Sequence, residues 1–297
     1  MFKNLCVEAL GISGQPNEVI EVALSNGFKG IDLDLTAFAA QVEARGLGHA
    51  RRLLDSSRLK LGTFALPVEW QVEDETQYRQ EIEKLRPLAE LAQQMKCARA
   101  TATIEPASDR RPYHENFEFH RRRIAEVSDF LATYGIRLGI GFVAPAHARA
   151  DKTFQFIQAA DAALLLISSV AAKNVGLVLD LWHWHLVGGT LEQVRNLPAE
   201  RIVKVIVSDA EPGVTAESAT DEARRLPGET GVIDVPAVLT HLAEIGYEGP
   251  ITPKAHPAHF GGQSRDKIVR TAAAALDQVW KAAGLNPAGK LSAPAGK

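Results

Sequence analysis

Short apolar runs rich in β-branched residues alternate eight times with longer amphipathic stretches along the 297 residues of this chain. Strands that are separated by helices pair in parallel through right-handed crossovers. Eight such units in a chain of this length match a closed (β/α)8 TIM barrel, an α/β fold. The predicted strands are Leu5–Leu10, Gly30–Leu35, Lys60–Leu66, Cys97–Ile104, Arg137–Val143, Val175–Leu181, Ile202–Asp209 and Ile251–His256.

The stretches between these runs carry helical signals. Apolar residues recur at helical spacing in Glu18–Asn26, and Gly27 is placed to end that helix. Asp234 is placed to cap another. A doubly wound open sheet is the rival architecture, but Gly11-Ile-Ser-Gly14 lacks the third glycine of a dinucleotide-binding motif. The barrel is therefore the favoured fold.

Charge and cysteine content narrow the classes of partner. With 33 Lys+Arg against 36 Asp+Glu, the formal net charge is -3, which supplies no broad cationic surface for nucleic acid. Neither a signal peptide nor a membrane-spanning apolar run is visible. Two cysteines, Cys6 and Cys97, cannot build a disulfide framework. We expect a cytoplasmic protein with no nucleic-acid or membrane partner.

One domain is predicted, over residues 1–284, because no composition shift marks a boundary within them. The segment 285–297 is rich in Gly, Ala, Pro and Lys, a composition that predicts a disordered C-terminal tail. In such barrels the functional residues stand at the carboxyl ends of the strands and in the loops that follow. These positions include Glu8, Asp32, Glu69, Asp180, Asp209 and Lys254.

Three motifs then carry a family resemblance. They are Val175–His183 (VGLVLDLWH), Arg225–Asp234 (RLPGETGVID) and Ile245–Ile251 (IGYEGPI). With them the chain resembles the xylose isomerase-like TIM barrels, the sugar phosphate isomerase/epimerase superfamily, from about Leu5 to Gly284. The resemblance implies a divalent metal held by Glu, Asp, His and Glu on strands five to eight. It also implies that the two Glu move a proton on the carbon next to a carbonyl.

Carried over position by position, most of that site is lost. Asp180 is kept on strand six, and His183 matches the family's substrate-contacting His. Gly141, Ile206 and Lys254 stand where the family has its other three ligands. One Asp does not hold Mg²⁺, Mn²⁺ or Zn²⁺ tightly, so no cofactor is expected. The alternative is a different divalent metal cluster, built from Asp180, Asp209, His256 and Glu69.

The substitutions suggest a metal-free site. A lone carboxylate deep in a barrel is costly, and the ammonium of Lys254 would balance Asp180. We therefore hypothesise that Lys254 stands in for the metal, as the group that polarises a carbonyl or as base or amine nucleophile. His183 and Glu69 complete the predicted catalytic set, as proton-transfer groups. The predicted substrate-binding residues are Trp70, Asp209, Arg225 and His256.

Each of these residues also has a structural interpretation, such as charge balance for Lys254, a loop cap for Asp209 and loop packing for Trp70. Two function classes stay open. One is an isomerase, epimerase or related lyase for a sugar or keto-polyol, and the other is a non-catalytic barrel that binds a sugar-like ligand. An abasic-site endonuclease shares the fold but needs a metal cluster and a basic face. The sequence predicts neither feature, so this function is discarded. By analogy with relatives, a homo-oligomer is possible in either case.

Overall fold

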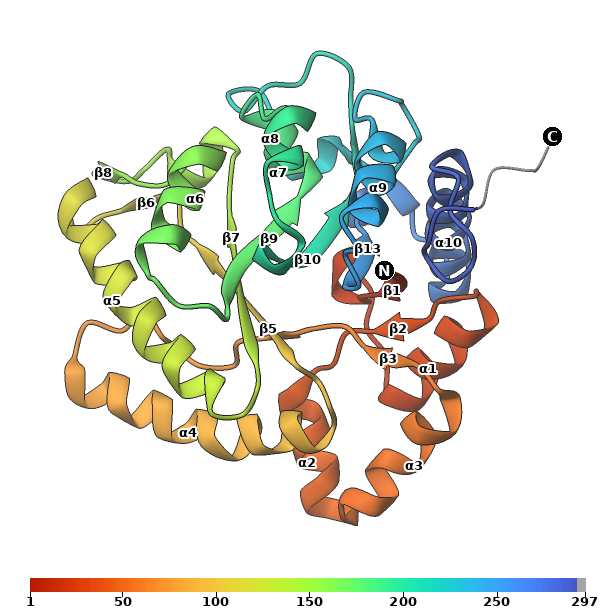
Figure 1. Ribbon diagram of the computed structural model, residues 1–297, viewed down its shortest axis with the longest axis horizontal. Coiled ribbons are helices and arrows are strands. Elements are labelled where there is room, and N and C mark those ends of the chain that lie inside the picture. Colours follow the sequence, from red (N-terminus) through yellow and green to blue (C-terminus); the bar gives the residue numbers. More distant parts are fainter. Residues whose placement is uncertain (293–297) are drawn as a thin grey trace.

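A curled parallel sheet ringed by helices forms the centre of the structure, a computed structural model that describes residues 1–292 (Figure 1). The hydrogen-bonded strand order is β3-β2-β1-β13-β10-β9-β7-β5-β4, and every neighbouring pair is parallel. The bounds are β1 (Phe2–Leu5), β2 (Gly30–Ile31), β3 (Lys60–Leu61), β4 (Phe64–Ala65), β5 (Arg99–Ile104), β7 (Arg137–Phe142), β9 (Val175–Asp180), β10 (Ile202–Val207) and β13 (Pro250–Pro253).

The two ends of this order, β3 and β4, are pieces of one predicted strand, Lys60–Leu66. β3 pairs with β2 and β4 pairs with β5, so the sheet closes on itself through this interrupted third strand. The eight predicted units and the TIM barrel are therefore confirmed.

Helices follow the strands and cover the outside of the sheet (Figure 1). Their starts follow from capping side chains: Asp34, Asp74 and Asp234 each accept a hydrogen bond from a backbone N–H in the first turn. The helices are α1 (Pro16–Ser25), α2 (Leu35–Arg45), α3 (Leu47–Ser57), α4 (Glu75–Gln94), α5 (Tyr113–Ala132), α6 (Ala160–Ser169), α7 (Leu181–Leu186), α8 (Leu191–Arg195), α9 (Val235–Glu244) and α10 (Arg265–Ala282). Within residues 1–292, none combines the length and apolar character needed to cross a membrane.

Two short antiparallel ribbons lie outside the barrel sheet. One joins β6 (Ala107–Ser108) to β8 (Phe154–Gln155). The other joins β11 (Asp209–Ala210), directly after strand seven, to β12 (Arg224–Arg225). The second ribbon folds the long loop after β10 back over the barrel, and it supplies residues to the site described below.

Some predicted boundaries were wrong. The first strand covers Phe2–Leu5, and the predicted segment Leu5–Leu10 instead enters a 3₁₀ turn at Glu8–Leu10. The second strand ends at Ile31, because Asp34 caps α2 and so turns the chain into a helix. Both errors are shifts of a few residues and leave the topology unchanged.

The predicted disordered tail also differs from the structure as far as Ser292. Leu285 is buried, Leu285 and Leu291 form a β-bridge, and Trp280 Nε1 donates to the backbone oxygen of Asn286 at 2.9 Å. This segment is fastened to the end of α10 and passes beside Met1, which Gly289 approaches closely. Residues 293–297 of the predicted tail lie outside the described residues.

The barrel interior contains a buried polar network below the mouth. Lys204 of β10 donates to Asp32 at 2.5 Å and to Thr63 Oγ1 at 3.1 Å. Asn4 of β1 donates to Asp32 at 2.8 Å and to Thr252 of β13 at 3.0 Å. Burial acts to lower the pKa of Lys204, but the negative charge of Asp32 and its hydrogen bond, with further contributions from neighbouring groups, together outweigh burial and raise that pKa. Lys204 therefore keeps its charge in the barrel interior and pairs with Asp32, which follows a strand that is not a neighbour of β10.

Candidate active site at the carboxyl ends of the strands

Asp180 is the last residue of β9 and also the N-cap of α7, where its side chain accepts a hydrogen bond from the backbone N–H of Trp182 at 3.1 Å. Its carboxylate is nearly enclosed, with 9% of the side chain exposed. Arg224 of β12 donates from Nη2 to both carboxylate oxygens, at 2.6 and 2.8 Å. The cation that balances Asp180 is therefore Arg224, where the sequence analysis placed Lys254.

Ser208 ties this ion pair to the eighth strand. It accepts a hydrogen bond from Arg224 Nε at 2.8 Å and donates its hydroxyl proton to the backbone oxygen of Lys254 at 2.6 Å. The Arg224 guanidinium also lies over the Trp182 ring, 5.3 Å from its centroid. Arg224 is thus held from three sides, and its own side chain is 4% exposed.

The electrostatics of Asp180 follow from this arrangement. Burial alone would raise the pKa of Asp180, but the positive charge of Arg224, with smaller contributions from His183 and Lys254, outweighs burial and lowers it. Asp180 is therefore a carboxylate throughout the neutral range, and both of its oxygens are already engaged.

Lys254 follows β13 directly, and its backbone N–H donates to Val207 O at 3.0 Å. Lys254 is half-buried, and within residues 1–292 its ammonium forms neither an ion pair nor a hydrogen bond. The positive charge of Arg224 lowers the pKa of Lys254, and burial lowers it further, while Asp180 acts in the opposite direction. The outcome is an amine that gives up its proton more readily than an ordinary lysine.

His183 lies on α7, one turn from Asp180. Its Nδ1 accepts a hydrogen bond from the backbone N–H of Ala144 at 3.3 Å, so in the neutral ring the proton is on Nε2. Burial lowers the pKa of His183 to about 4, and the charges of Arg224 and Lys254 add to that effect. At neutral pH this imidazole is uncharged and offers one N–H as a donor.

The remaining predicted residues do not join this group. Asp209 is fully buried and accepts hydrogen bonds from the backbone N–H groups of Thr230, Gly231 and Ile233, at 3.0, 2.7 and 3.0 Å. Burial acts to raise the pKa of Asp209, but these donors outweigh it and hold the pKa low. Asp209 therefore pins the loop before α9.

Arg225 and His256 also make contacts of their own. In the β11–β12 ribbon Arg225 pairs with Glu211, and its Nη1 lies 3.2 Å from His259 Nδ1. His256 Nδ1 accepts from Ala258 N at 3.3 Å and so caps a short 3₁₀ helix. Both are partly exposed at the rim of the barrel.

Glu69 and Trp70 stand in the loop after β4. Trp70 is buried, and its ring meets that of His120 edge-on at 5.5 Å. The Glu69 side chain is exposed, while its backbone N–H donates to Glu81 at 3.1 Å. Neither residue contacts Asp180, Arg224 or Lys254 in the interactions that the structure records.

The mouth of the barrel is hollowed beside strands one to four. A cavity of about 360 Å³ opens there, and Lys204 and Asp32 are among the residues that line it. β1 and β13 are neighbouring parallel strands. Cys6 directly follows β1 and Lys254 directly follows β13, so the two residues stand after adjacent strands. The polar residues that line this mouth cavity are Cys6, Glu8, Asp32, Asp34, Thr36, Thr63, Thr101 and Lys204.

Sequence reasoning missed Arg224 and Lys204. In an antiparallel ribbon, successive side chains face opposite sides, so of the adjacent Arg224 and Arg225 only one reaches the barrel, and the sequence does not tell which. Lys204 had a readable signal. It stands among valines and isoleucines in Ile202–Val207, a charged residue inside an otherwise apolar strand.

The donor set does not fit the divalent metal that the family resemblance implies. Asp180 has both oxygens on Arg224, and no carboxylate, imidazole or thiol side chain stands at Gly141, Ile206 or Lys254. Within residues 1–292, no group of three or more His, Cys, Asp or Glu residues is arranged to hold a metal ion.

Comparisons with known proteins agree with the fold. A family model described as a xylose isomerase-like TIM barrel matches residues 20–279. Inosose isomerase from Bacillus subtilis (strain 168) is 28% identical over 149 residues, 50% of each protein, so the chain spans about half the length of this curated relative.

Two solved structures superpose over nearly the whole chain. A xylose isomerase domain protein from Alicyclobacillus acidocaldarius has a TM-score of 0.84 at 23% identity and covers 95% of this chain and 98% of its own. The IOLI protein, crystallised with a binding zinc atom, has a TM-score of 0.76 at 19% identity and covers 96% and 98%. At these identities the likeness concerns the fold.

Proposed function

Because this chain belongs to the xylose isomerase-like TIM-barrel family, we propose that it is an isomerase or epimerase-like enzyme for a sugar or keto-polyol. In this proposal it moves the proton next to a carbonyl with Lys254, in place of a metal and paired carboxylates. The observation that carries it is the Asp180–Arg224 ion pair, at the residue that the resemblance matches to a metal ligand, with Lys254 lacking an ion-pair partner within residues 1–292.

Lys254 is suited to act as the base. A neutral amine takes the proton from the carbon next to the carbonyl, the C–H electron pair forms the C=C bond, and the carbonyl oxygen takes the negative charge of an enediolate. Returning the proton to the neighbouring carbon, or to the other face of the same carbon, gives the isomer or the epimer. Arg224 and burial favour the neutral amine, because both lower the pKa of Lys254.

His183 is suited to stabilise the developing oxyanion. Its Nδ1 is occupied by the Ala144 N–H, so Nε2–H is the free donor. A neutral imidazole with a pKa of about 4 donates this hydrogen bond without becoming charged or losing its proton at neutral pH.

The mouth cavity is suited to a polyol. Its volume of about 360 Å³ holds a sugar-sized ligand, and hydroxyl and carboxylate groups line it. Glu8, exposed at the end of β1, is the carboxylate we propose for the second proton-transfer role. Glu8 lines the cavity and follows β1, whose neighbour in the sheet, β13, is followed directly by Lys254.

A non-catalytic, ligand-binding barrel is the second candidate. The enclosure of Asp180 by Arg224 favours it, because a site kept only for structure is expected to close its former metal position with a buried ion pair. In that case Lys254 and His183 contact a sugar-like ligand but transfer no proton.

Solvent-proton exchange separates the two candidates. The full chain is incubated in D₂O with inosose, D-fructose and D-tagatose as probes, and deuterium next to the carbonyl is followed by NMR. Lys254→Met is expected to lower the exchange rate by about 10²–10⁴-fold, the usual contribution of a general base. Lys173→Met, at an exposed lysine after α6, is the matched control.

Turnover that survives in Lys254→Met would contradict the assignment of the base. Saturable binding of a probe by the wild-type chain without any exchange would establish the non-catalytic candidate instead.

A further inference from the structure

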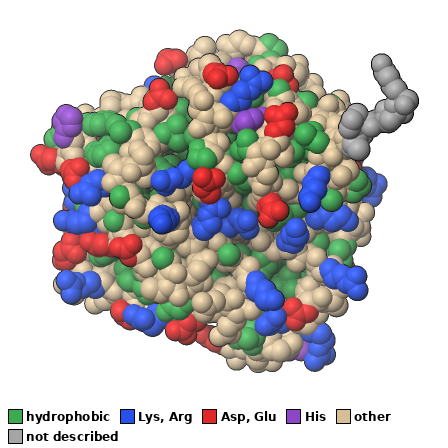
Figure 2. All heavy atoms as spheres, in the orientation of Figure 1, with side chains coloured by type: hydrophobic (Ala, Val, Ile, Leu, Met, Phe, Trp, Pro, Cys, Tyr) green, Lys and Arg blue, Asp and Glu red, His purple; other side chains and the backbone are tan. Residues whose placement is uncertain are grey.

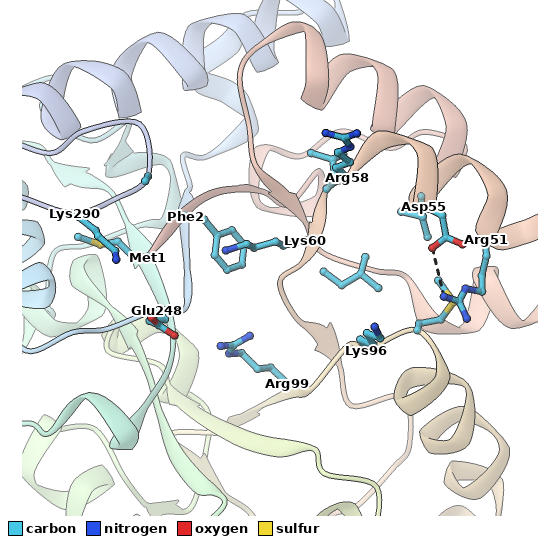
Figure 3. A pocket seen from close by; sticks show the side chains of 15 residues that line it. Met1, Phe2, Arg51, Asp55, Arg58, Lys60, Lys96, Arg99, Glu248 and Lys290 are labelled. Carbon is cyan, nitrogen blue, oxygen red and sulfur yellow. Dashed lines mark hydrogen bonds and ion pairs between the residues drawn. The ribbon is translucent and has the colours of Figure 1, made fainter.

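Figure 3 shows a second cavity, of about 730 Å³, at the end of the barrel where strands begin, whereas Lys254 follows the end of β13. It opens where strands begin, since Phe2, Lys60 and Arg99 are the first residues of β1, β3 and β5. We call it the amino-end cavity. Ends of this kind normally serve stability in TIM barrels, so its composition calls for a physical explanation.

Cationic side chains dominate its wall. Arg51, Arg58, Lys60, Lys96, Arg99 and Lys290 line it, against two carboxylates, Asp55 and Glu248. The six cationic residues come from α3 and its C-cap, β3, the α4–β5 turn, β5 and the segment after α10. Figure 3 shows them around one open space. The chain as a whole carries a formal net charge of -3, so this concentration is local. On the face drawn in Figure 2, Lys and Arg side chains stand across the middle with Asp and Glu side chains among them.

Most of these cations lack an anionic partner. Asp55 engages Arg51 at 3.4 Å. Within residues 1–292, the other five cationic groups form no ion pair, and Lys60 lies over the Phe2 ring at 5.1 Å. The Nε atoms of Arg51 and Arg99 are buried and have no hydrogen-bond partner in the described chain. A buried guanidinium N–H without a hydrogen-bond acceptor costs folding free energy, unless a bound ligand or solvent supplies the acceptor.

Backbone conformation gives a second, independent indication. Among the described residues other than glycine, only three have positive φ, and two of them, Arg58 and Lys96, line this cavity. Both end a helix in the left-handed region, where glycine is the residue without a steric cost. The chain therefore places long cationic side chains at positions where glycine would favour the fold, and strain of this kind is typical of functional sites.

We propose that the amino-end cavity binds a small polyphosphate, a ligand with two or more phosphate groups. Arg and Lys from five segments converge on the space, and guanidinium forks and ammonium groups are the usual partners of phosphate oxygens. The apolar floor of Leu54, Leu59 and Met95 suits the organic part of such a ligand. Inorganic triphosphate and a nucleoside triphosphate share the recognised chemistry.

The test exploits the strained positions. Arg58→Gly and Lys96→Gly each remove a cation and relieve left-handed strain, so both variants are expected to fold at least as stably as the wild type. Ala171→Gly, at the third positive-φ position and outside the cavity wall, relieves strain without removing charge and is the matched control.

Calorimetric titration with inorganic triphosphate, ATP and adenosine, at constant ionic strength and pH 7, gives the readout. We expect triphosphate and ATP to bind and adenosine not to bind. Each glycine variant should weaken Kd about tenfold and the double variant about a hundredfold, with Ala171→Gly unchanged. ATP binding tighter than triphosphate also supports the proposal, because the apolar floor then contributes.

Three outcomes would overturn it. One is the absence of saturable triphosphate and ATP binding by the wild-type chain. Another is an unchanged Kd in the Arg58→Gly/Lys96→Gly double variant. The third is loss of binding in Lys254→Met, which would place the anion at the other end of the barrel.

Discussion

One guanidinium nitrogen of Arg224 donates hydrogen bonds to both carboxylate oxygens of Asp180, at 2.6 and 2.8 Å, in a buried setting after strands six and seven. Asp180 is the residue that the family resemblance matches to a metal ligand, and Arg224 occupies its carboxylate. The positive charge of Arg224 also lowers the pKa of Lys254.

Breaking the pair from one side should destabilise the fold. Arg224→Met leaves the buried Asp180 carboxylate without a cation, which typically costs about 3–5 kcal/mol of unfolding free energy. Denaturant unfolding followed by circular dichroism measures it. The Asp180→Asn/Arg224→Met double variant removes both charges and should recover most of the loss, and a double variant as unstable as the single one would contradict this account.

Metal should have little effect on this protein. Because Asp180 is engaged and the other family ligand positions hold no donor, we expect purified protein to contain far less than one Mn²⁺, Zn²⁺ or Mg²⁺ per chain. EDTA and added metal should leave the melting temperature unchanged. Elemental analysis and thermal shift measure both, with Asp180→Asn as the control for any weak binding. A stoichiometric ion that disappears in Asp180→Asn would reverse the conclusion.

Stability should fall between about pH 6.5 and pH 4. Burial lowers the pKa of both His183 and His120 to about 4, below the value of about 6.5 in an unfolded chain. The unfolded state therefore binds more protons in this window, so unfolding free energy decreases as pH falls, by up to about 1.4 kcal/mol per pH unit for each histidine.

Urea titrations at a series of pH values give this slope. The His120→Asn/His183→Asn double variant should show a smaller slope over the same window than the wild type. An equal slope in both proteins would mean that other groups are responsible.

The pH dependence of exchange should report Lys254. If its amine is the base, the rate rises with pH as the amine loses its proton, with a midpoint below the usual value for lysine, because Arg224 and burial lower its pKa. Arg224→Gln removes the positive charge and should move the midpoint upward, whereas Arg224→Lys keeps the charge and should move it less. A midpoint insensitive to both changes would separate Lys254 from the rate.

The barrel could be predicted from sequence because its signals are local and repeated. Eight apolar runs, and caps such as Asp234, are each sufficient evidence for one element, and the βα order then leaves few topologies. Boundaries depended on competition between neighbouring elements. Asp34 shows this: alternation with Ile31 and Leu33 indicates a strand, but its side chain caps α2 at Ala37 N and ends the strand earlier.

The candidate site was predictable where a residue ends a strand and less so where it comes from a loop. Asp180 and Lys254 stand at the ends of predicted strands, and His183 was identified through the family resemblance. Arg224 reaches Asp180 only because the ribbon after strand seven folds back, a long-range arrangement with no local signal. For the same reason, Asp209 was expected to contact substrate, while the structure surrounds it with backbone N–H groups from the loop it anchors.

The interruption of the third strand has a mechanical consequence. The wall of the barrel passes from β3 to β4 at Gly62 and Thr63, and Lys204 from the far wall reaches across to Thr63 and Asp32. At this interruption the barrel wall is thus held from inside by a charged side chain. Opening the barrel there means pulling an ammonium away from its carboxylate, so ion pairing adds to the resistance that the short strand pairs provide.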